Sequence, residues 1–511
     1  MSSKSPNILV IQADQMTAMA LSAYGHKLVK TPNLDRLAER GTVFENAYCN
    51  FPLCVPSRAS MLAGRYANSI SMWDNAIEMP ASVPTLAHSL RELDYHTVLC
   101  GKMHFIGPDQ VHGFNERITT DIYPSNFAWT PDWIVGERYR PTGINMRAVV
   151  DAGQCVRSLQ IDYDEEVEFA GQQKLYDLAR FNKEKPWLLW VSFTHPHSPF
   201  ITTGRYWDQY DHDSVDMPAV PTMSVEEMDT MSRWLFHAHG GDLHDITDEH
   251  IRNARHAYYG MCTYIDDKVG RLLDTLDEVG LEDDTVIVFT SDHGEMLGER
   301  GQWFKQSFHE WSVRVPLIVS MPGESVRDRV NELVSLVDLM PTFTDIASNG
   351  NSPESIIPMD GHSLLPLLQS GADWDNQVIS EYTGEGVCAP CRMIRRDDMK
   401  FIYTHGHPDL MFDLKQDPLE VNNLVSNAAY AEIEASLKAE VLAGWNPQTI
   451  NDACLQSQKE RLFIQKTTGG MPNYAFKYRP DDGERYVRND SAVGTKAKAR
   501  HPFVEPTPFN R

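Results

Sequence analysis

The chain has 511 residues, of which 42% are hydrophobic and 23% are charged, as is ordinary for a globular protein. Its formal net charge of −25 argues against a nucleic-acid partner, because phosphate binding needs a basic surface. No stretch approaches the roughly 20 apolar residues of a membrane-spanning helix, so the sequence predicts no integral membrane protein.

The N-terminus and the cysteines indicate the compartment. The apolar run that begins at residue 7 is too short for a signal peptide and is followed by Asp14. The eight cysteines are scattered along the chain without the pattern of a disulfide framework. We therefore expect a cytoplasmic protein.

The first predicted strand is NILVIQADQ, residues 7–15, and it ends in Asp14 and Gln15. A helix is predicted for TPNLDRLAERG, residues 31–41. Pro32 suits its first turn, and Gly41 suits its end.

Cys54 lies in the stretch CNFPLCVPSRASMLAGRY, residues 49–66. The commonest role of a free cysteine is that of a small buried hydrophobic side chain. The alternative is a thiolate nucleophile, which needs a nearby histidine. Residues 57–65 are predicted to begin a helix whose free backbone amides would face an anion.

Three more apolar runs follow: YHTVLCGKMH (residues 95–104), WLLWVSFTHPH (187–197) and DTVIVFTSDHGE (284–295). Strands covered by helices on both faces are nearly continuously apolar. Their alternation with helices predicts an α/β fold, with a large mixed, mostly parallel sheet between helical layers. Because ligands bind beyond the carboxyl ends of such strands, we expect one site there. The polar residues that the four runs bring to it are Asp14, Gln15, Lys102, His104, His195, His197, Asp292 and His293.

After about residue 375 the pattern changes to short strands and turns. We predict a catalytic domain over residues 1–375 and a small antiparallel α+β subdomain over 376–445, with a helix near 429–443. Residues 446–511 are predicted to be an extended tail, because they are polar and contain Pro502, Pro506 and Pro508 near the end. The tail is either frayed or an arm that packs on a neighbouring subunit of a dimer or tetramer.

The pairs Asp14–Gln15 and Asp292–His293 predict a metal site. Two carboxylates at neighbouring strand ends repel each other unless a cation lies between them. Oxygen ligands suit Ca²⁺ or Mg²⁺, and an added imidazole also admits Mn²⁺. The alternative is that Asp292 and His293 only cap a following helix.

Five further side chains are potential cations in an otherwise acidic chain, and four of them lie in the clusters at the strand ends or beside Cys54. Together they predict a receptor for a small tetrahedral oxyanion. Taken singly, each is more simply read as a solvated lysine or a hydrogen-bonded polar group. The five are Arg58, Lys102, His104, His197 and Lys305.

The motif around Cys54 gives a third interpretation of that residue. It reads Cys-x-Pro-Ser-Arg followed by x-x-x-Leu-x-Gly-Arg, which is seven fixed positions over residues 54–65. The chain resembles the type I sulfatase family of the alkaline-phosphatase-like superfamily over residues 7 to about 445. In that family the cysteine is oxidised to formylglycine by a maturation enzyme, which would be a partner of this chain.

The resemblance implies roles for the other residues. Asp14, Gln15, Asp292, His293 and the modified Cys54 would hold a divalent metal, most often Ca²⁺. Arg58, Lys102, His104, His197 and Lys305 would bind sulfate and transfer protons, with His197 or Lys305 as the acid and His104 as the base. Many sulfatases have Asp where this chain has Gln15 and Asn where it has His293, and these departures leave the metal's identity open.

The segments DNAIE (74–78), GKMHFIGPDQVHGF (101–114), TTDIYPSNFAWTPDW (119–133) and SFTHPHSP (192–199) look like those of choline sulfatases. They also share features with aryl sulfatases and phosphonate monoester hydrolases. Two features differ from choline sulfatases: the segment 134–150 lacks their aromatic and histidine residues, and Ser57 replaces an alanine. For a quaternary ammonium substrate, aromatic faces and a countercharge would be needed. The candidate substrate residues are Asn75, Tyr123, Trp129, Trp133 and Glu385, although the aromatic ones are equally well read as core.

Three functions therefore remain open. The first is a sulfatase acting on a small choline-like, aryl or alkyl sulfate ester, with a carbohydrate sulfatase as a variant. The second is a phosphate or phosphonate ester hydrolase, and the third is a binding protein that has lost catalysis. A redox role for Cys388 and Cys391 is weaker, because no βαβ setting surrounds them.

Overall fold

The computed structural model describes residues 5–141, 144–182, 184–323, 327–352, 356–369, 373–468 and 499–505. Its centre is a nine-stranded mixed sheet with the strand order β10-β2-β11-β9-β1-β7-β3-β4, in which β12 also pairs with β2. The core strands β9, β1, β7 and β3 are mutually parallel, and β11 is antiparallel to both β9 and β2. The strands are β1 Asn7–Ala13, β2 Thr42–Tyr48, β3 His96–Gly101, β4 Glu116–Arg117, β7 Trp187–Ser192, β9 Thr285–Ser291, β10 Arg314–Val315, β11 Leu317–Ser320 and β12 Arg329–Ser335.

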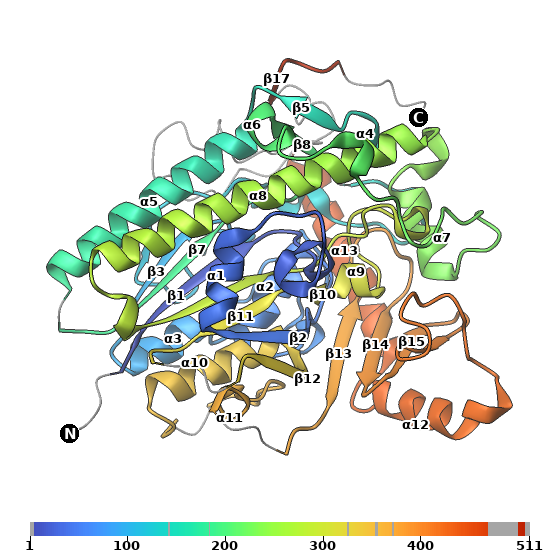
Figure 1. The fold of residues 1–511 in the computed structure, drawn as a ribbon. Helices are drawn as coiled ribbons and strands as arrows, with labels where there is room; N and C mark the ends of the chain where they lie inside the picture. Colours follow the sequence, from blue (N-terminus) through green and yellow to red (C-terminus); the bar gives the residue numbers. More distant parts are fainter. Residues whose placement is uncertain are drawn as a thin grey trace.

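Helices cover both faces of this sheet (Figure 1). Along β1, Ile8 and Val10 join one hydrophobic core, whereas Leu9 and Ile11 join the other. This alternation places the two faces of every central strand against different helical layers. One layer contains α1 (Pro32–Arg40), α5 (Leu159–Phe181) and α8 (Asp248–Glu278), and the other contains α2 (Cys54–Ala63), α3 (Leu86–Glu92) and α10 (Leu339–Ala347). The predicted α/β architecture is confirmed.

Five further α-helices among the described residues precede the second sheet in the chain, and they are short. They lie around the edges of the sheet and in the connections between strands. They are α4 (Arg147–Val150), α6 (Gly204–Trp207), α7 (Thr230–Ala238), α9 (Glu310–Val313) and α11 (Leu365–Gln369).

A second, four-stranded antiparallel sheet lies beside the first one (Figure 1). It consists of β13 (Gln377–Tyr382), β14 (Cys391–Arg396), β15 (Met399–Thr404) and β16 (Leu410–Asp413), and α12 (Ala431–Val441) packs on it. The small antiparallel sheet and its helix occur where the sequence predicted them. The limits of the predicted domains, at residues 375 and 445, stay predictions.

The predicted extended tail is wrong in its first part. Residues Pro447–Thr468 form the helix α13, and Asn446 accepts a hydrogen bond from the Thr449 amide at its start. The helix is amphipathic enough to bury Cys454, Gln458 and Arg461 against the main body. Of the rest of the predicted tail, residues 499–505 are described and include β17 (Arg500–His501), which pairs with β6 (Arg157–Ser158). Residues 469–498 and 506–511 lie outside the described residues.

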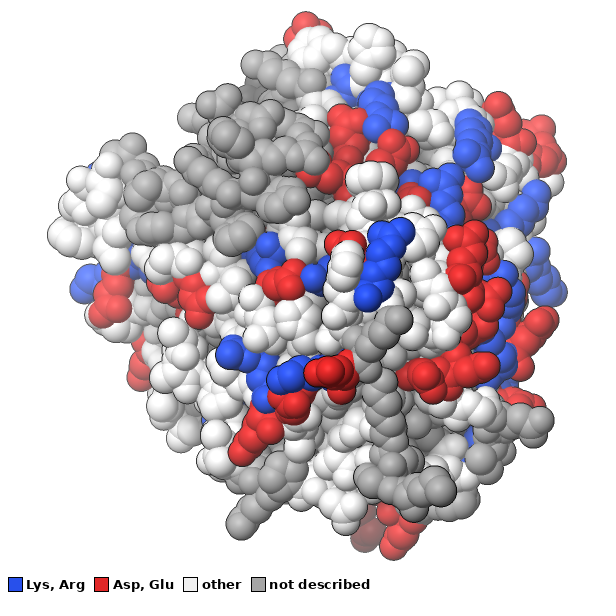
Figure 2. Space-filling model, turned by 90° about the vertical axis from the view of Figure 1, so that its left-hand side faces the viewer, with Lys and Arg blue, Asp and Glu red and all other residues white. Residues whose placement is uncertain are grey.

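Charged groups are mixed on the face that Figure 2 shows. Lysine and arginine alternate there with aspartate and glutamate, and no continuous basic surface spans the described residues of that face. Among the described helices, none is long and apolar enough to cross a bilayer.

Candidate active site

Four adjacent strands of the central sheet bring the predicted polar residues to one edge. Asp14 and Gln15 follow β1, Lys102 follows β3, His197 follows β7, and Asp292 follows β9. Gln15 and His104 both have positive φ values, 64° and 61°. Left-handed backbone is costly for such residues and is typical of functional sites.

The turn after β9 is held by a close backbone contact. Gly294 and Glu295 donate hydrogen bonds to the carbonyl oxygens of Ser312 and Trp311 in α9. A Cβ atom at Gly294 would lie 2.0 Å from the Trp311 oxygen, so only glycine fits there. No helix follows Asp292 and His293 directly, and the helix-capping alternative is therefore wrong.

Cys54 is the first residue of α2, and its side chain lies among the predicted metal ligands. Its Sγ is 3.2 Å from His293 Nε2 and 4.0 Å from Asp14 Oδ1. Burial and the neighbouring Asp14 raise the pKa of the Cys54 thiol to about 11. At neutral pH the unmodified side chain is a thiol, which is a poor nucleophile.

The donor set fits a divalent ion. One ligand atom from each of Asp14, Cys54, Asp292 and His293 lies within 4.8 Å of all the others, and all four residues are buried. Carboxylate oxygens with an imidazole nitrogen suit Ca²⁺, Mg²⁺ or Mn²⁺. Burial lowers the pKa of His293 to about 4, so its ring is neutral and able to bind a metal.

Arg58 lies between the two carboxylates of this group. Its Nη2 is 2.9 Å from Asp14 Oδ2, and its Nε is 2.8 Å from Asp292 Oδ2. Its Nη1 donates to Ser192 Oγ and to the Lys102 carbonyl oxygen. The guanidinium therefore orients the two carboxylates that are predicted to bind the metal, whereas the sequence predicted it to face the anion directly.

The start of α2 also differs from the prediction of free amides. The Val55 amide donates to Asn75 Oδ1, and the Ser57 amide donates to the Leu53 carbonyl oxygen. The helix begins at Cys54, ahead of the predicted start at residue 57, so the Ser57 amide that was expected to face an anion has a protein acceptor. The Ser57 hydroxyl donates to the Asp292 carbonyl oxygen and ties α2 to β9.

Two lysines supply the remaining positive charge. Lys102 Nζ contacts Asp14 Oδ2 and is 3.9 Å from Cys54 Sγ. Burial alone would raise the pKa of Asp14, but Lys102 and its other cationic neighbours hold it well below its usual range. Lys305 Nζ donates to Gln15 Oε1 at 2.5 Å and lies 2.8 Å from His197 Nε2.

These contacts show which ring nitrogen of His197 carries the proton. An ammonium group only donates, so His197 Nε2 accepts from Lys305. His197 Nδ1 lies 2.7 Å from the Ser198 carbonyl oxygen, to which it donates. The ring is therefore neutral, and Lys305 is the protonated member of the pair.

His104 is the second neutral histidine. Burial and the nearby Lys102 lower its pKa to about 3. Neither ring nitrogen has a hydrogen-bond partner among the described residues, although both are buried. The backbone amides of Met103 and His104 donate to Asp121, which holds this strained turn in place.

The predicted substrate residues form a second group beside the metal ligands. Asn75 bridges Val55, next to Cys54, and Glu385, whose Oε1 is 3.1 Å from Asn75 Nδ2. Trp133 Nε1 donates to the Gly384 carbonyl oxygen. Glu385 Oε2 has no partner among the described residues, and burial together with Asp74 raises the pKa of Glu385 to about 8.

Tyr123 and Trp129 lie closer to the lysines. Lys102 Nζ is 4.2 Å from the centre of the Tyr123 ring, so this aromatic face already binds a cation of the protein. Trp129 packs edge-on against His104, and its Nε1 has no partner among the described residues.

Three buried contacts near the site were not predicted. Glu295 accepts from Gln15, Asp164 pairs with His195 Nδ1 at 2.6 Å, and Asp74 pairs with Arg461 of α13. His195 thus supports the turn rather than joining the metal ligands. Glu295 is the last residue of the predicted strand segment 284–295. Its acidic side chain, two residues after His293, was the signal by which it could have been found in the sequence.

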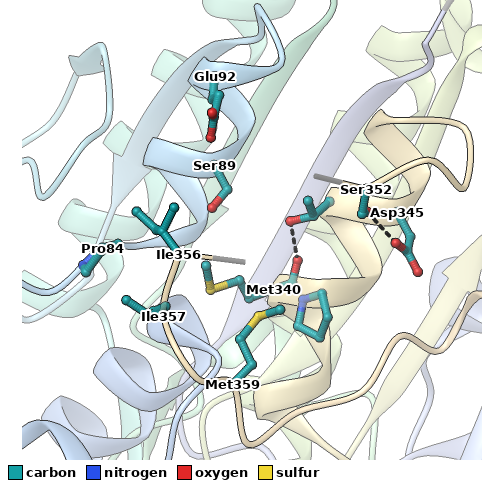
Figure 3. Close-up of a pocket in the computed structure, with 11 residues that line it drawn as sticks. Pro84, Ser89, Glu92, Met340, Asp345, Ser352, Ile356, Ile357 and Met359 are labelled. Atoms are coloured by element: carbon teal, nitrogen blue, oxygen red, sulfur yellow. Dashed lines mark hydrogen bonds between the residues drawn. The ribbon is translucent and has the colours of Figure 1, made fainter. Parts of the chain in front are cut away.

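A pocket of about 80 Å³ opens elsewhere, between α3 and α10 (Figure 3). Met340, Met359, Ile356 and Ile357 line it, and it shares no residue with the candidate site. Its lining includes Glu92 and Asp345 but no cationic side chain that would bind a sulfate group.

The comparisons with known proteins agree with the predicted resemblance. The family model described as sulfatase matches residues 6–349, and one described as the C-terminal part of N-sulphoglucosamine sulphohydrolase matches residues 298–445. The choline-sulfatase of Rhizobium meliloti (strain 1021) is 40% identical over 99% of this chain and 100% of its own length. Arylsulfatase K of Bos taurus is 28% identical over 92% of this chain and 87% of its own.

Solved structures have the same fold. The phosphonate monoester hydrolase of Agrobacterium radiobacter superposes with a TM-score of 0.68 and 26% identity, covering 86% of this chain and 95% of that one. The phosphonate monoester hydrolase SpPMH from Silicibacter pomeroyi has a TM-score of 0.70 at 24% identity, covering 86% of this chain and 95% of its own.

Proposed function

The chain belongs to the sulfatase family and is a sulfuric ester hydrolase, and we propose that its substrate is a small sulfate ester with a quaternary ammonium group, such as choline sulfate. The observation that carries this proposal is the buried Glu385 carboxyl group, whose Oε2 has no partner among the described residues and which follows Gly384, the acceptor of the Trp133 Nε1 hydrogen bond. A carboxylate next to an aromatic ring is the usual receptor for such a cation. The likeness to the Rhizobium choline-sulfatase supports it.

We propose that Cys54 is converted to formylglycine by a maturation enzyme and that a divalent ion, Ca²⁺ or else Mn²⁺ or Mg²⁺, binds at Asp14, Gln15, Asp292, His293 and residue 54. The hydrated aldehyde would supply one hydroxyl that attacks sulfur and a second that allows sulfate to leave. The ion, when bound, would lower the pKa of that nucleophile and offset charge on the sulfate oxygens.

The other residues of the site would bind the ester and move protons. Lys102 would bind the sulfate oxygens. Lys305 carries a proton and would give it to the departing alcohol, with the neutral His197 taking part in its delivery. His104 is neutral, and its ring nitrogens have no partner in the described part of the chain, so it would accept the proton released when sulfate leaves.

Mass spectrometry and a substrate panel test the proposal. After expression with a maturation enzyme, the peptide containing Cys54 should carry the aldehyde. Choline sulfate should give a higher kcat/KM than nitrophenyl sulfate or sulfated sugars, and E385Q should remove that preference while leaving nitrophenyl sulfate turnover nearly unchanged. Full activity with an unmodified Cys54 would exclude the mechanism, and equal activity on all sulfates would exclude the choline-like substrate.

A second candidate is hydrolysis of a phosphonate or phosphate ester. The similar structures named phosphonate monoester hydrolase favour it, and the cationic pocket does not separate tetrahedral phosphorus from sulfur. Parallel kinetics with nitrophenyl sulfate, phosphate and phenylphosphonate distinguish the two. A higher kcat/KM for a phosphorus ester would reverse the ranking.

Compartment and assembly remain part of the proposal. All eight cysteines are free thiols, which supports a reducing, cytoplasmic compartment. The exposed Ile134 and Phe463 line one hollow on α13, which supports a contact between subunits of a homo-oligomer. Light scattering of the purified protein measures that assembly.

A further inference from the structure

Glu295 is a fully buried carboxylate to which the mechanism assigns no part. Its Oε1 accepts from the backbone amides of Leu297 at 3.0 Å and Phe304 at 2.6 Å. Its Oε2 accepts from Gln15 Nε2. The carboxylate therefore joins the loop 295–304 to the strand end that carries the predicted metal ligands.

The orientation of the Gln15 amide depends on this contact. An amide has nearly the same shape in both orientations, but one end donates and the other accepts. A carboxylate accepts at both oxygens, so the Nε2 end of Gln15 faces Glu295. The Oε1 end then faces Lys305 Nζ, at 2.5 Å.

Only the oxygen end of the amide can act as a ligand, because Ca²⁺ and Mg²⁺ bind carbonyl oxygens and the amide NH₂ has no available lone pair. The Gln15 backbone is fixed as well, since its amide nitrogen donates to Asp292 Oδ1 at 3.1 Å. The contact between the Gln15 side-chain amide and Glu295 therefore decides whether Gln15 turns its oxygen toward the predicted metal site.

We propose that Glu295 is a positioning residue that orients the Gln15 amide so that its oxygen faces the divalent ion and Lys305. The inference rests on the proposed metal site.

The variant E295Q tests the orientation with little change in shape. The new amide oxygen would still accept from Leu297 and Phe304, so the loop 295–304 should keep its hydrogen bonds. The new NH₂ group would instead meet Gln15 Nε2, and two donors would face each other. In its present orientation Gln15 would then face a donor at position 295, and after rotation its NH₂ would face the Lys305 ammonium, so neither orientation holds the Gln15 oxygen firmly toward the ion.

The measurement is the affinity for Mn²⁺, by electron paramagnetic resonance on metal-stripped protein. E295Q should bind Mn²⁺ about 10- to 100-fold more weakly than the wild type, as is usual when the partner of a metal ligand is lost. Its urea unfolding midpoint should stay close to that of the wild type.

The double variant Q15E/E295Q provides the rescue. The new amide at position 295 would donate to the new carboxylate at position 15. The hydrogen bond between the two side chains is then restored with donor and acceptor exchanged, and the second carboxylate oxygen of residue 15 faces the ion. We expect its Mn²⁺ affinity to equal or exceed that of the wild type, whereas Q15E alone sets two carboxylates against each other and should bind more weakly than the double variant.

Wild-type affinity in E295Q, or a double variant as weak as the two single effects combined, would overturn the inference. Either result with an active wild-type enzyme leaves the proposed function intact. A wild-type chain that binds no Mn²⁺, Ca²⁺ or Mg²⁺ at this site would overturn both.

Discussion

At the scale of single residues, the protonation states of the histidines and lysines in the site give these side chains different roles. The sequence treats His104, His197 and Lys305 alike as potential cations. The hydrogen bonds of His197 make its ring neutral, with the Lys305 ammonium next to Nε2, whereas burial and the nearby Lys102 keep His104 neutral. Only the lysine is therefore ready to protonate a leaving group.

Lys305→Met should slow substrates with poor leaving groups most. An alkyl alkoxide needs a proton to depart, and general acid catalysis contributes about 10²–10⁴-fold. We expect kcat for choline sulfate to fall by about this factor, whereas nitrophenyl sulfate, whose phenolate leaves without help, loses far less. Steady-state kinetics on both substrates measure the difference. An equal loss on both would show that Lys305 acts on the sulfate group or on Gln15 instead.

Glu385 gives a pH dependence for a cationic substrate. Its pKa is raised to about 8 by burial and by Asp74, so below pH 8 the carboxyl is mostly protonated and neutral. The charge needed to bind an ammonium group appears as the pH rises. The KM for choline sulfate should therefore fall between pH 6.5 and 8.5, while the KM for nitrophenyl sulfate lacks this change.

E385Q is the matched variant, because it keeps the shape and removes the titration. Its KM for choline sulfate should be high and should no longer fall over this pH range. If the wild-type KM for choline sulfate is flat from pH 6.5 to 8.5, Glu385 does not bind the cation.

At the scale of elements, the strands could be predicted but α13 could not. The apolar runs of β1, β3, β7 and β9 are local, and parallel strands covered on both faces allow no other pattern. Helix α13 is mostly polar, and what holds it in place lies far away in the chain. Arg461 pairs with Asp74, and Gln458 accepts from the Trp133 amide.

The same reason limits the prediction of the site. Residues at the strand ends were found because each follows an apolar run. The orientation of Arg58 toward two carboxylates, and the role of Glu295, depend on contacts between β1, α2 and the turn after β9. A single sequence carries no signal for the direction in which a side chain points across such a junction.

Arg461→Met should loosen α13 and with it the substrate pocket. Both guanidinium nitrogens of Arg461 lie 2.6 Å from the Asp74 carboxylate, and both side chains are buried. Removing one partner of a buried pair costs about 3–5 kcal/mol of unfolding free energy. Because Asp74 precedes Asn75, we also expect a higher KM for choline sulfate. Urea unfolding and steady-state kinetics measure the two effects.

Two further variants check this explanation. K459M removes an exposed charge from the same helix and should change little. D74N/R461M removes both charges and should recover part of the lost stability, because no uncompensated carboxylate is left buried. A double variant that is less stable than R461M would argue against the ion pair as the cause.

At the scale of the whole molecule, a buried ionic cluster joins the two sheets. Lys400 of β15 lies 2.8 Å from both Glu310 of α9 and Glu420, and it is fully buried. Tyr48 of β2 donates to Glu310, and His309 lies 3.3 Å from Glu420. Because α9 also accepts the backbone hydrogen bonds of Gly294 and Glu295, the cluster connects the small sheet to the turn that carries Asp292 and His293.

Lys400→Met should destabilise the protein most at neutral pH. In the wild type, burial would raise the pKa values of Glu310 and Glu420, but Lys400 holds both below their usual range. Carboxyl groups with lowered pKa stabilise the fold above the unfolded value of about 4.3, and this contribution is lost as the pH falls. Without the lysine the two buried carboxylates repel each other at pH 7, at a cost of about 3–5 kcal/mol.

The pH dependence of that cost distinguishes the ion cluster from simple loss of packing. In K400M both carboxyl pKa values should rise, so protonation relieves the repulsion while the wild type loses its ionic stabilisation. The difference in unfolding free energy between wild type and K400M should therefore be largest near pH 7 and smaller near pH 4, as measured by urea unfolding at each pH. The control K415M removes an exposed lysine whose Nζ is 4.0 Å from Asp398, and its effect should be small at both pH values. A difference between wild type and K400M that stays constant from pH 7 to pH 4 would mean that the lysine acts through its apolar stem and that its charge does not hold the two sheets together.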